Sequence, residues 1–189
     1  MRRLFNRMLR RKPATRELFV HEDDWGQIEI VPAACRAWCE QEIARIEAFA
    51  ARHAAPDGAG WTDMYVRQSA PVALEGLRMS FEAAAQAIGA HLPAIDIVLS
   101  GTFSSPEPVA HVRGFGPTAN TGVVLVSDAT RTYVAAITLV LHGSREHQRD
   151  VLAALADLPA PSQVLLVDWV QGRVVPLDDG SAIAGYLDA

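Results

Sequence analysis

The sequence predicts an α+β fold: a mostly antiparallel sheet with two or three helices packed on one face. Short stretches with strand propensity outnumber helical stretches, and short turns join most neighbouring strands, which is typical of antiparallel pairing. Half of the residues are hydrophobic and 21% are charged, which is enough apolar material for a core. The 189 residues are expected to form a basic arm at residues 1–13 and one domain at residues 14–189.

The first elements are predicted to be a hairpin and a long helix. Residues 16–20 have the pattern of an entry strand, and residues 27–31 alternate polar and apolar side chains, as a half-buried strand does. Residues 33–53 carry the strongest helical pattern, with an apolar arc of about 140°. Its members are Cys35, Trp38, Cys39, Ile43, Ile46 and Phe49.

The rest of the chain is predicted to alternate short strands with short helices. Ser80 and Ser144 have the side chain and the position of helix N-caps. The predicted helices are residues 81–89, 145–157 and 181–187. The predicted strands are residues 61–66, 95–99, 111–113, 123–126, 132–141, 164–170 and 173–177. Residues 114–122, with three glycines and a proline, are predicted to be a loop.

The charges are unevenly distributed along the chain. Residues 1–12 carry six basic side chains and no acid, so the rest of the chain holds 11 of the 17 basic residues and all 22 acidic ones. Such an acidic body repels phosphates, which argues against nucleic-acid binding by the domain and favours a small-molecule site or a basic protein partner. For residues 1–12, three interpretations remain open: a basic amphipathic anchor for anionic lipid or nucleic acid, docking onto the acidic body or a neighbouring subunit, and a frayed terminus without function.

An acidic turn is the strongest candidate for a partner-binding site. Glu22, Asp23 and Asp24 adjoin Trp25, so carboxylates lie beside an aromatic side chain that could anchor a partner. A solvated turn and a cation site are the alternatives, but the calcium-loop spacing of acidic residues is absent. We expect no cofactor and no metal.

A second candidate is a pocket lined by Glu42, His111 or His142. Glu42 lies on the apolar arc of the long helix, where a lone carboxylate is costly to bury. It is therefore expected to be neutral, or paired with Arg45 or with a residue of another element. Cys35 and Cys39, one turn apart, are expected to be buried thiols, since two ligands alone do not make a zinc site.

The sequence contains none of the standard catalytic motifs, including G-x-S-x-G, H-E-x-x-H and the Walker A loop. We therefore expect a small protein-interaction module with an acidic surface, one that neutralises or chaperones a basic partner such as a toxin. An enzyme or small-molecule binder with a Glu/His-lined pocket is the alternative. The absence of a signal-peptide pattern, of an apolar run of about 18 residues and of a disulfide framework favours the cytoplasm. The oligomeric state stays open.

Overall fold

The computed structural model describes residues 15–58 and 60–188, and its fold is α+β with a mostly antiparallel sheet, as the sequence predicts. A seven-stranded sheet has the order β10-β9-β2-β8-β7-β6-β3, and a three-stranded sheet has the order β1-β4-β5. The pair β1–β4 is parallel, whereas the other strand pairs of the described residues are antiparallel. The predicted arm at residues 1–13 lies outside the described part of the chain.

The strands are β1 (Glu17–His21), β2 (Ile28–Pro32), β3 (Ala94–Ile95), β4 (Ile97–Thr102), β5 (Ser105–Pro108), β6 (Val112–Thr118), β7 (Thr121–Ser127), β8 (Val134–Leu141), β9 (Val164–Asp168) and β10 (Arg173–Pro176). The helices are α1 (Arg36–His53), α2 (Phe81–Gly89), α3 (Arg145–Ala156) and α4 (Gly180–Leu187). Short 3-10 turns are η1 (Glu22–Asp24), η2 (Ala33–Cys35), η3 (Leu74–Leu77) and η4 (Pro161–Gln163). No helix in these ranges is both long and apolar enough to cross a membrane.

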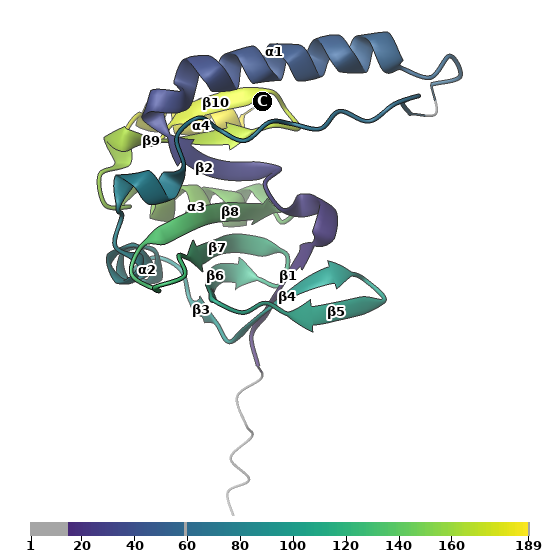
Figure 1. The fold of residues 1–189 in the computed structure, drawn as a ribbon. Coiled ribbons are helices and arrows are strands. Elements are labelled where there is room, and N and C mark those ends of the chain that lie inside the picture. Colours follow the sequence, from purple (N-terminus) through teal and green to yellow (C-terminus); the bar gives the residue numbers. More distant parts are fainter. Residues whose placement is uncertain (1–14, 59, 189) are drawn as a thin grey trace, which may run out of the picture.

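The large sheet is the middle of three layers (Figure 1). One face packs against α2, α3 and α4 in a core that includes Ile137, Leu155 and Leu166. The opposite face packs α1 through Cys39, Ile43 and neighbours, and packs the small sheet through a separate cluster. Three helices therefore share one face, as predicted, and α1 covers part of the other.

The predicted hairpin over residues 16–31 is wrong. The strand β1 pairs with β4 in the small sheet, whereas β2 pairs with β9 and β8 in the large one. The reason is burial: Leu18 and Val20 of β1 pack against Val124 and Val140 on the surface of the large sheet. The acidic turn between β1 and β2 thus connects two sheets.

Two further predictions about strands are corrected. Residues 114–118, predicted to be a loop, belong to β6, and facing glycines let β6 and β7 approach closely around a register shift. Residues 61–66, predicted to be a strand, have no place in either sheet. They begin an extended segment, residues 61–73, that returns beneath α1 towards η3 and that we call the strap (Figure 1).

Candidate functional site

The acidic turn η1 is held by two histidines. The backbone N–H of Asp23 donates to Nδ1 of His21 at 3.3 Å. The carboxylate of Asp24 lies 3.0 Å from Nε2 of His142, which is contributed by the end of β8. Glu22 and Asp23 remain exposed to solvent. Both side chains are therefore accessible to a partner.

The side chain of Trp25 is held by contacts within the protein. Its indole N–H donates to Oγ of Ser100 at 2.6 Å, and its ring packs against the cluster between the two sheets. The side chain is half-buried. Trp25 thus fixes the acidic turn against β4 and presents only part of its ring to solvent.

A different aromatic residue is exposed next to the turn. Phe103, between β4 and β5, is 82% exposed, and its ring centroid lies 5.1 Å from that of His21 and 5.0 Å from that of Phe19. Sequence reasoning missed Phe103. The available signal was a lone phenylalanine in a run of glycine, threonine and serine, where a hairpin tip could expose it.

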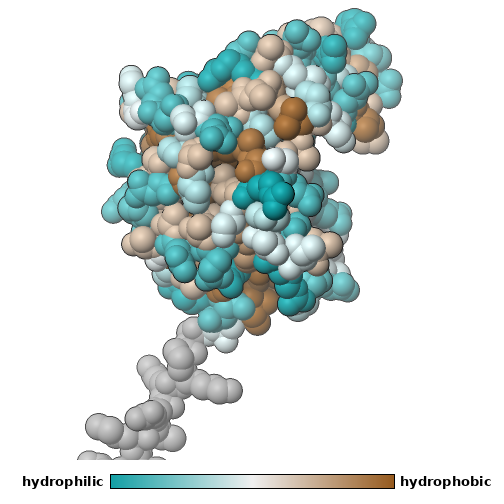
Figure 2. Space-filling model, turned by 60° about the vertical axis from the view of Figure 1, so that its left-hand side comes forward, coloured by the Kyte–Doolittle hydropathy of each residue, from teal (hydrophilic) through white to brown (hydrophobic). Residues whose placement is uncertain are grey.

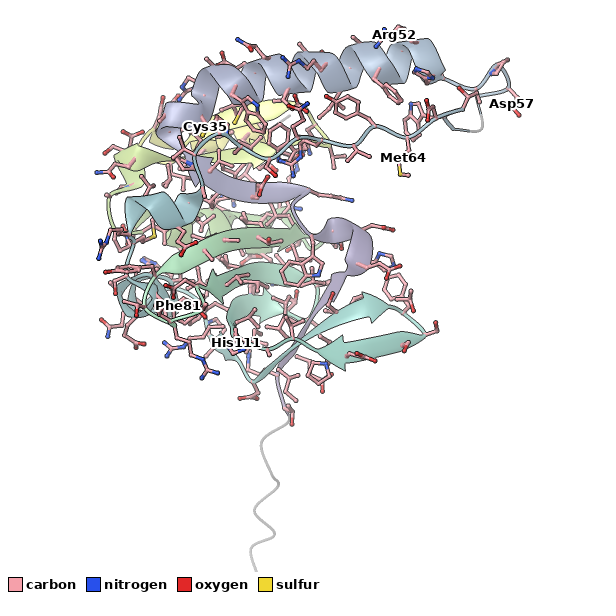
Figure 3. All side chains as sticks on the ribbon, in the orientation of Figure 1. Cys35, Arg52, Asp57, Met64, Phe81 and His111 are labelled. Atoms are coloured by element: carbon pink, nitrogen blue, oxygen red, sulfur yellow. The ribbon has the colours of Figure 1, made fainter. Side chains whose placement is uncertain are left out.

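The strap exposes four further large apolar side chains, Val72 and three that lie in its first half. Trp61 is 68% exposed, Met64 79% and Val66 78%. Part of the strap and the second half of α1 enclose an apolar groove of about 390 Å³. Its lining includes Ile46, Phe49, Ala50, Trp61, Met64 and Tyr65. Figure 3 shows Met64 pointing away from α1, and Figure 2 shows this end of the molecule projecting beyond the body.

Glu42 ties the strap to α1. Its side chain is fully buried and accepts hydrogen bonds from Tyr65 Oη at 2.8 Å and from Arg45 at 2.9 Å. The backbone N–H of Gln68 also donates to it, at 3.4 Å. Arg45 is the partner that the sequence predicts for Glu42, and the strap supplies the other two, Tyr65 and Gln68. Burial by itself would raise the pKa of Glu42, but these hydrogen bonds and the charge of Arg45 outweigh it, so the pKa lies below its ordinary 4.5.

This lowered pKa predicts a pH dependence of stability. A carboxylate whose pKa is lower in the folded state stabilises it above the unfolded-state pKa, and this contribution disappears as the pH falls through the folded-state value. The free energy of unfolding should therefore fall as the pH drops below about 4.5, and the Glu42→Gln variant should show a shallower fall. Urea unfolding over a pH series, compared with the exposed Glu75→Gln as a control, measures this. Equal slopes in wild type and Glu42→Gln would contradict it.

Arg67 attaches the strap to the body. It donates to Oε1 of Glu29 at 2.6 Å and to the carbonyl of Gly26 at 3.1 Å. Its guanidinium lies 4.1 Å from the centroid of the Trp169 ring, whose N–H donates to the same Glu29 oxygen at 2.9 Å. The Arg67 side chain is thus held both by stacking on Trp169 and by a charged hydrogen bond to Glu29.

The exposed features lie on one side of the large sheet, and we call this side the acidic–apolar face. It comprises the exposed side chains of Glu22, Asp23, Trp61, Met64, Val66 and Phe103, together with Asp24, which is partly buried and paired with His142. The contact of Arg67 with Gly26 joins the strap to the segment after η1, and the contact of His21 with Phe103 joins η1 to the β4–β5 hairpin. Figure 1 shows the strap, η1 and the hairpin on the same side of the large sheet.

The three residues predicted to line a pocket lie apart. Glu42 is enclosed by α1 and the strap, beside β9 and β10. His111 precedes β6, four strands further across the sheet than β9, and lines a shallow hollow with Phe81, Arg113 and neighbours (Figure 3). His142 pairs with Asp24. At about 4.8 Å per strand, Glu42 and His111 cannot act on one substrate.

The two cysteines are free and buried in the cluster beneath α1. Burial and the neighbouring Cys35 raise the pKa of the Cys39 thiol to about 11, so the thiol stays protonated and unreactive at neutral pH. Among the residues that the structure describes, no three histidine, cysteine, aspartate or glutamate side chains are grouped to hold a metal ion.

Comparisons with protein-family models, with curated proteins and with solved structures found no match to this chain.

Proposed function

We propose that this protein is an interaction module that binds a basic protein partner through the acidic–apolar face. One observation carries the proposal. Six large apolar side chains are exposed among the described residues, and four of them, Trp61, Met64, Val66 and Phe103, belong to this face. Scattered exposed apolar residues are ordinary, but a group of them with a polar rim is typical of an interaction surface.

The chemistry of the face defines the partner. Trp61 and Met64 have the size and adaptability to fill pockets or to receive an apolar side chain. Glu22 and Asp23 favour lysine and arginine nearby, and the acidic body steers a basic protein towards the face over longer distances. A module of this kind would neutralise or chaperone its partner, for example a toxin. We place it in the cytoplasm, where two buried thiols remain reduced.

The test is capture of partners from the native host with the full chain and with matched variants. The wild type should enrich a basic protein, and Trp61→Ala with Met64→Ala should weaken that complex about 30-fold, as loss of a 2 kcal/mol anchor does. Glu22→Gln with Asp23→Asn should weaken it most strongly at low salt.

The control removes two charges elsewhere. Glu146→Gln with Asp150→Asn neutralises exposed carboxylates of α3, which covers the other face of the large sheet. This variant should bind as the wild type does. An enriched protein that is acidic, or one whose binding survives both sets of changes in the acidic–apolar face, would refute the proposal.

A further inference from the structure

The strands β2 and β8 are neighbours in the sheet but pair at a single position, Glu29 opposite Thr138. Beyond this pair the strands separate, and η3 packs against both of them. Leu74 of η3 is buried in the core between the sheet and its helices. The sheet thus contains an internal gap beyond the pair of Glu29 and Thr138. Figure 1 shows that β2 and β8 diverge along their length.

Both walls of the gap are strand edges. Residues 30–32 of β2 pair with β9 on their other side, and residues 136 and 137 of β8 pair with β7 on theirs. In a strand, alternate residues direct their N–H and C=O groups to opposite edges. Within the described residues, no strand pairing joins the two walls beyond Glu29 and Thr138. The edge of β2 therefore presents mainly carbonyl oxygens to the gap, since Pro32 has no N–H, and the edge of β8 presents backbone groups from the other side.

The gap contains a pocket that is open to solvent and has a volume of about 360 Å³. Small side chains line much of it, from the strap and from β8: Ser69, Ala70, Ala73, Ala135 and Ala136. The charged side chains in the lining are Glu29 and Arg67, and they pair with each other at 2.6 Å. A ligand here meets hydrogen-bonding backbone and small side chains, with no unbalanced charge.

We propose that this gap binds a short extended peptide segment with small, uncharged side chains. A peptide backbone presents N–H and C=O groups at the spacing of a strand edge, so it can add to β2 or β8 by strand addition. Small side chains match the alanine-lined walls, and neutrality matches the internal ion pair. The site is distinct from the acidic–apolar face and does not depend on its function.

The probe is acetyl-tetraalanine amide, added at millimolar concentration to the ¹⁵N-labelled full chain. Amide resonances of Val31, Ala135, Ala136 and Ile137 should shift progressively, whereas those of α3 should not. The matched control is the same peptide with N-methylated amides, which keeps the carbonyl acceptors but cannot donate. It should bind at least about tenfold more weakly, which corresponds to about 1.4 kcal/mol.

Two variants obstruct the gap from different walls. Ala136→Phe fills it from β8, and Ser69→Trp fills it from the strap, so either one suffices if the other fails to fold. Each folded variant should lose the peptide-induced shifts. Absence of shifts in the wild type, equal shifts with the methylated peptide, or shifts that persist in a folded obstructed variant would each overturn the proposal.

Discussion

Replacing Gly122 by alanine is expected to lower the free energy of unfolding by about 3 kcal/mol or more. A Cβ atom at this buried position in β7 would lie 2.4 Å from the carbonyl oxygen of Phe115 and 3.2 Å from a methyl group of Leu18. The carbonyl oxygen of Phe115 belongs to the backbone of the adjacent strand β6, so no side-chain rotation can relieve its clash with the new Cβ atom. Urea unfolding followed by circular dichroism measures the loss.

The matched control is Gly185→Ala. Gly185 lies in α4, is exposed, and a Cβ there would meet no atom within 4 Å. Alanine has the higher helix propensity, so this variant should be more stable by about 0.5–1 kcal/mol. The same substitution is thus expected to have opposite signs at the two sites. A Gly122→Ala protein as stable as the wild type would show that β6 and β7 can separate without cost.

Replacing Arg67 by alanine should release the strap from the body. The variant loses the ion pair with Glu29, the bond to the Gly26 carbonyl and the stacking on Trp169. Because Glu29 and Arg67 are both about a quarter exposed, solvent screens part of the effect, and we expect a loss of about 2 kcal/mol. Hydrogen exchange at the Gln68 amide, which donates to Glu42, should accelerate as the strap opens locally.

Two further variants test whether the effect is specific to the Arg67 side chain. Arg67→Lys keeps the charge but not the planar fork that both stacks and donates, so it should rescue little of the loss. Arg78→Ala also removes an arginine that bonds to and stacks on an aromatic residue, Tyr133, but at an exposed site. It should leave the unfolding midpoint unchanged. Equal effects of Arg67→Ala and Arg78→Ala would mean that Arg67 does not hold the strap.

The acidic–apolar face could be predicted only in part. The run Glu22, Asp23, Asp24 is visible in the sequence because its residues are adjacent. Trp61, Met64 and Val66 also follow one another closely, but their pattern predicts a strand with large side chains on both faces. Exposure depends on what covers a segment, and the strap lies at the margin of the fold without a strand partner.

The sequence by itself determined the locally encoded elements of this protein. These elements depend on residues that are close along the chain. They are the helical spacing of apolar residues in α1, the serine caps of α2 and α3, and the β7–β8 and β9–β10 hairpins. Such signals need no knowledge of distant partners, so they could be recognised before the fold was known.

Only the tertiary structure decided which distant segments meet. It pairs β1 with β4 across some 80 residues, brings Tyr65 to Glu42, and separates Glu42 from His111. It also opens the gap between β2 and β8, whose sequences predict only two strands. The physical reason is that a strand's pattern specifies which side chains are buried but not which edge it pairs with, and that choice follows from the packing of the whole core.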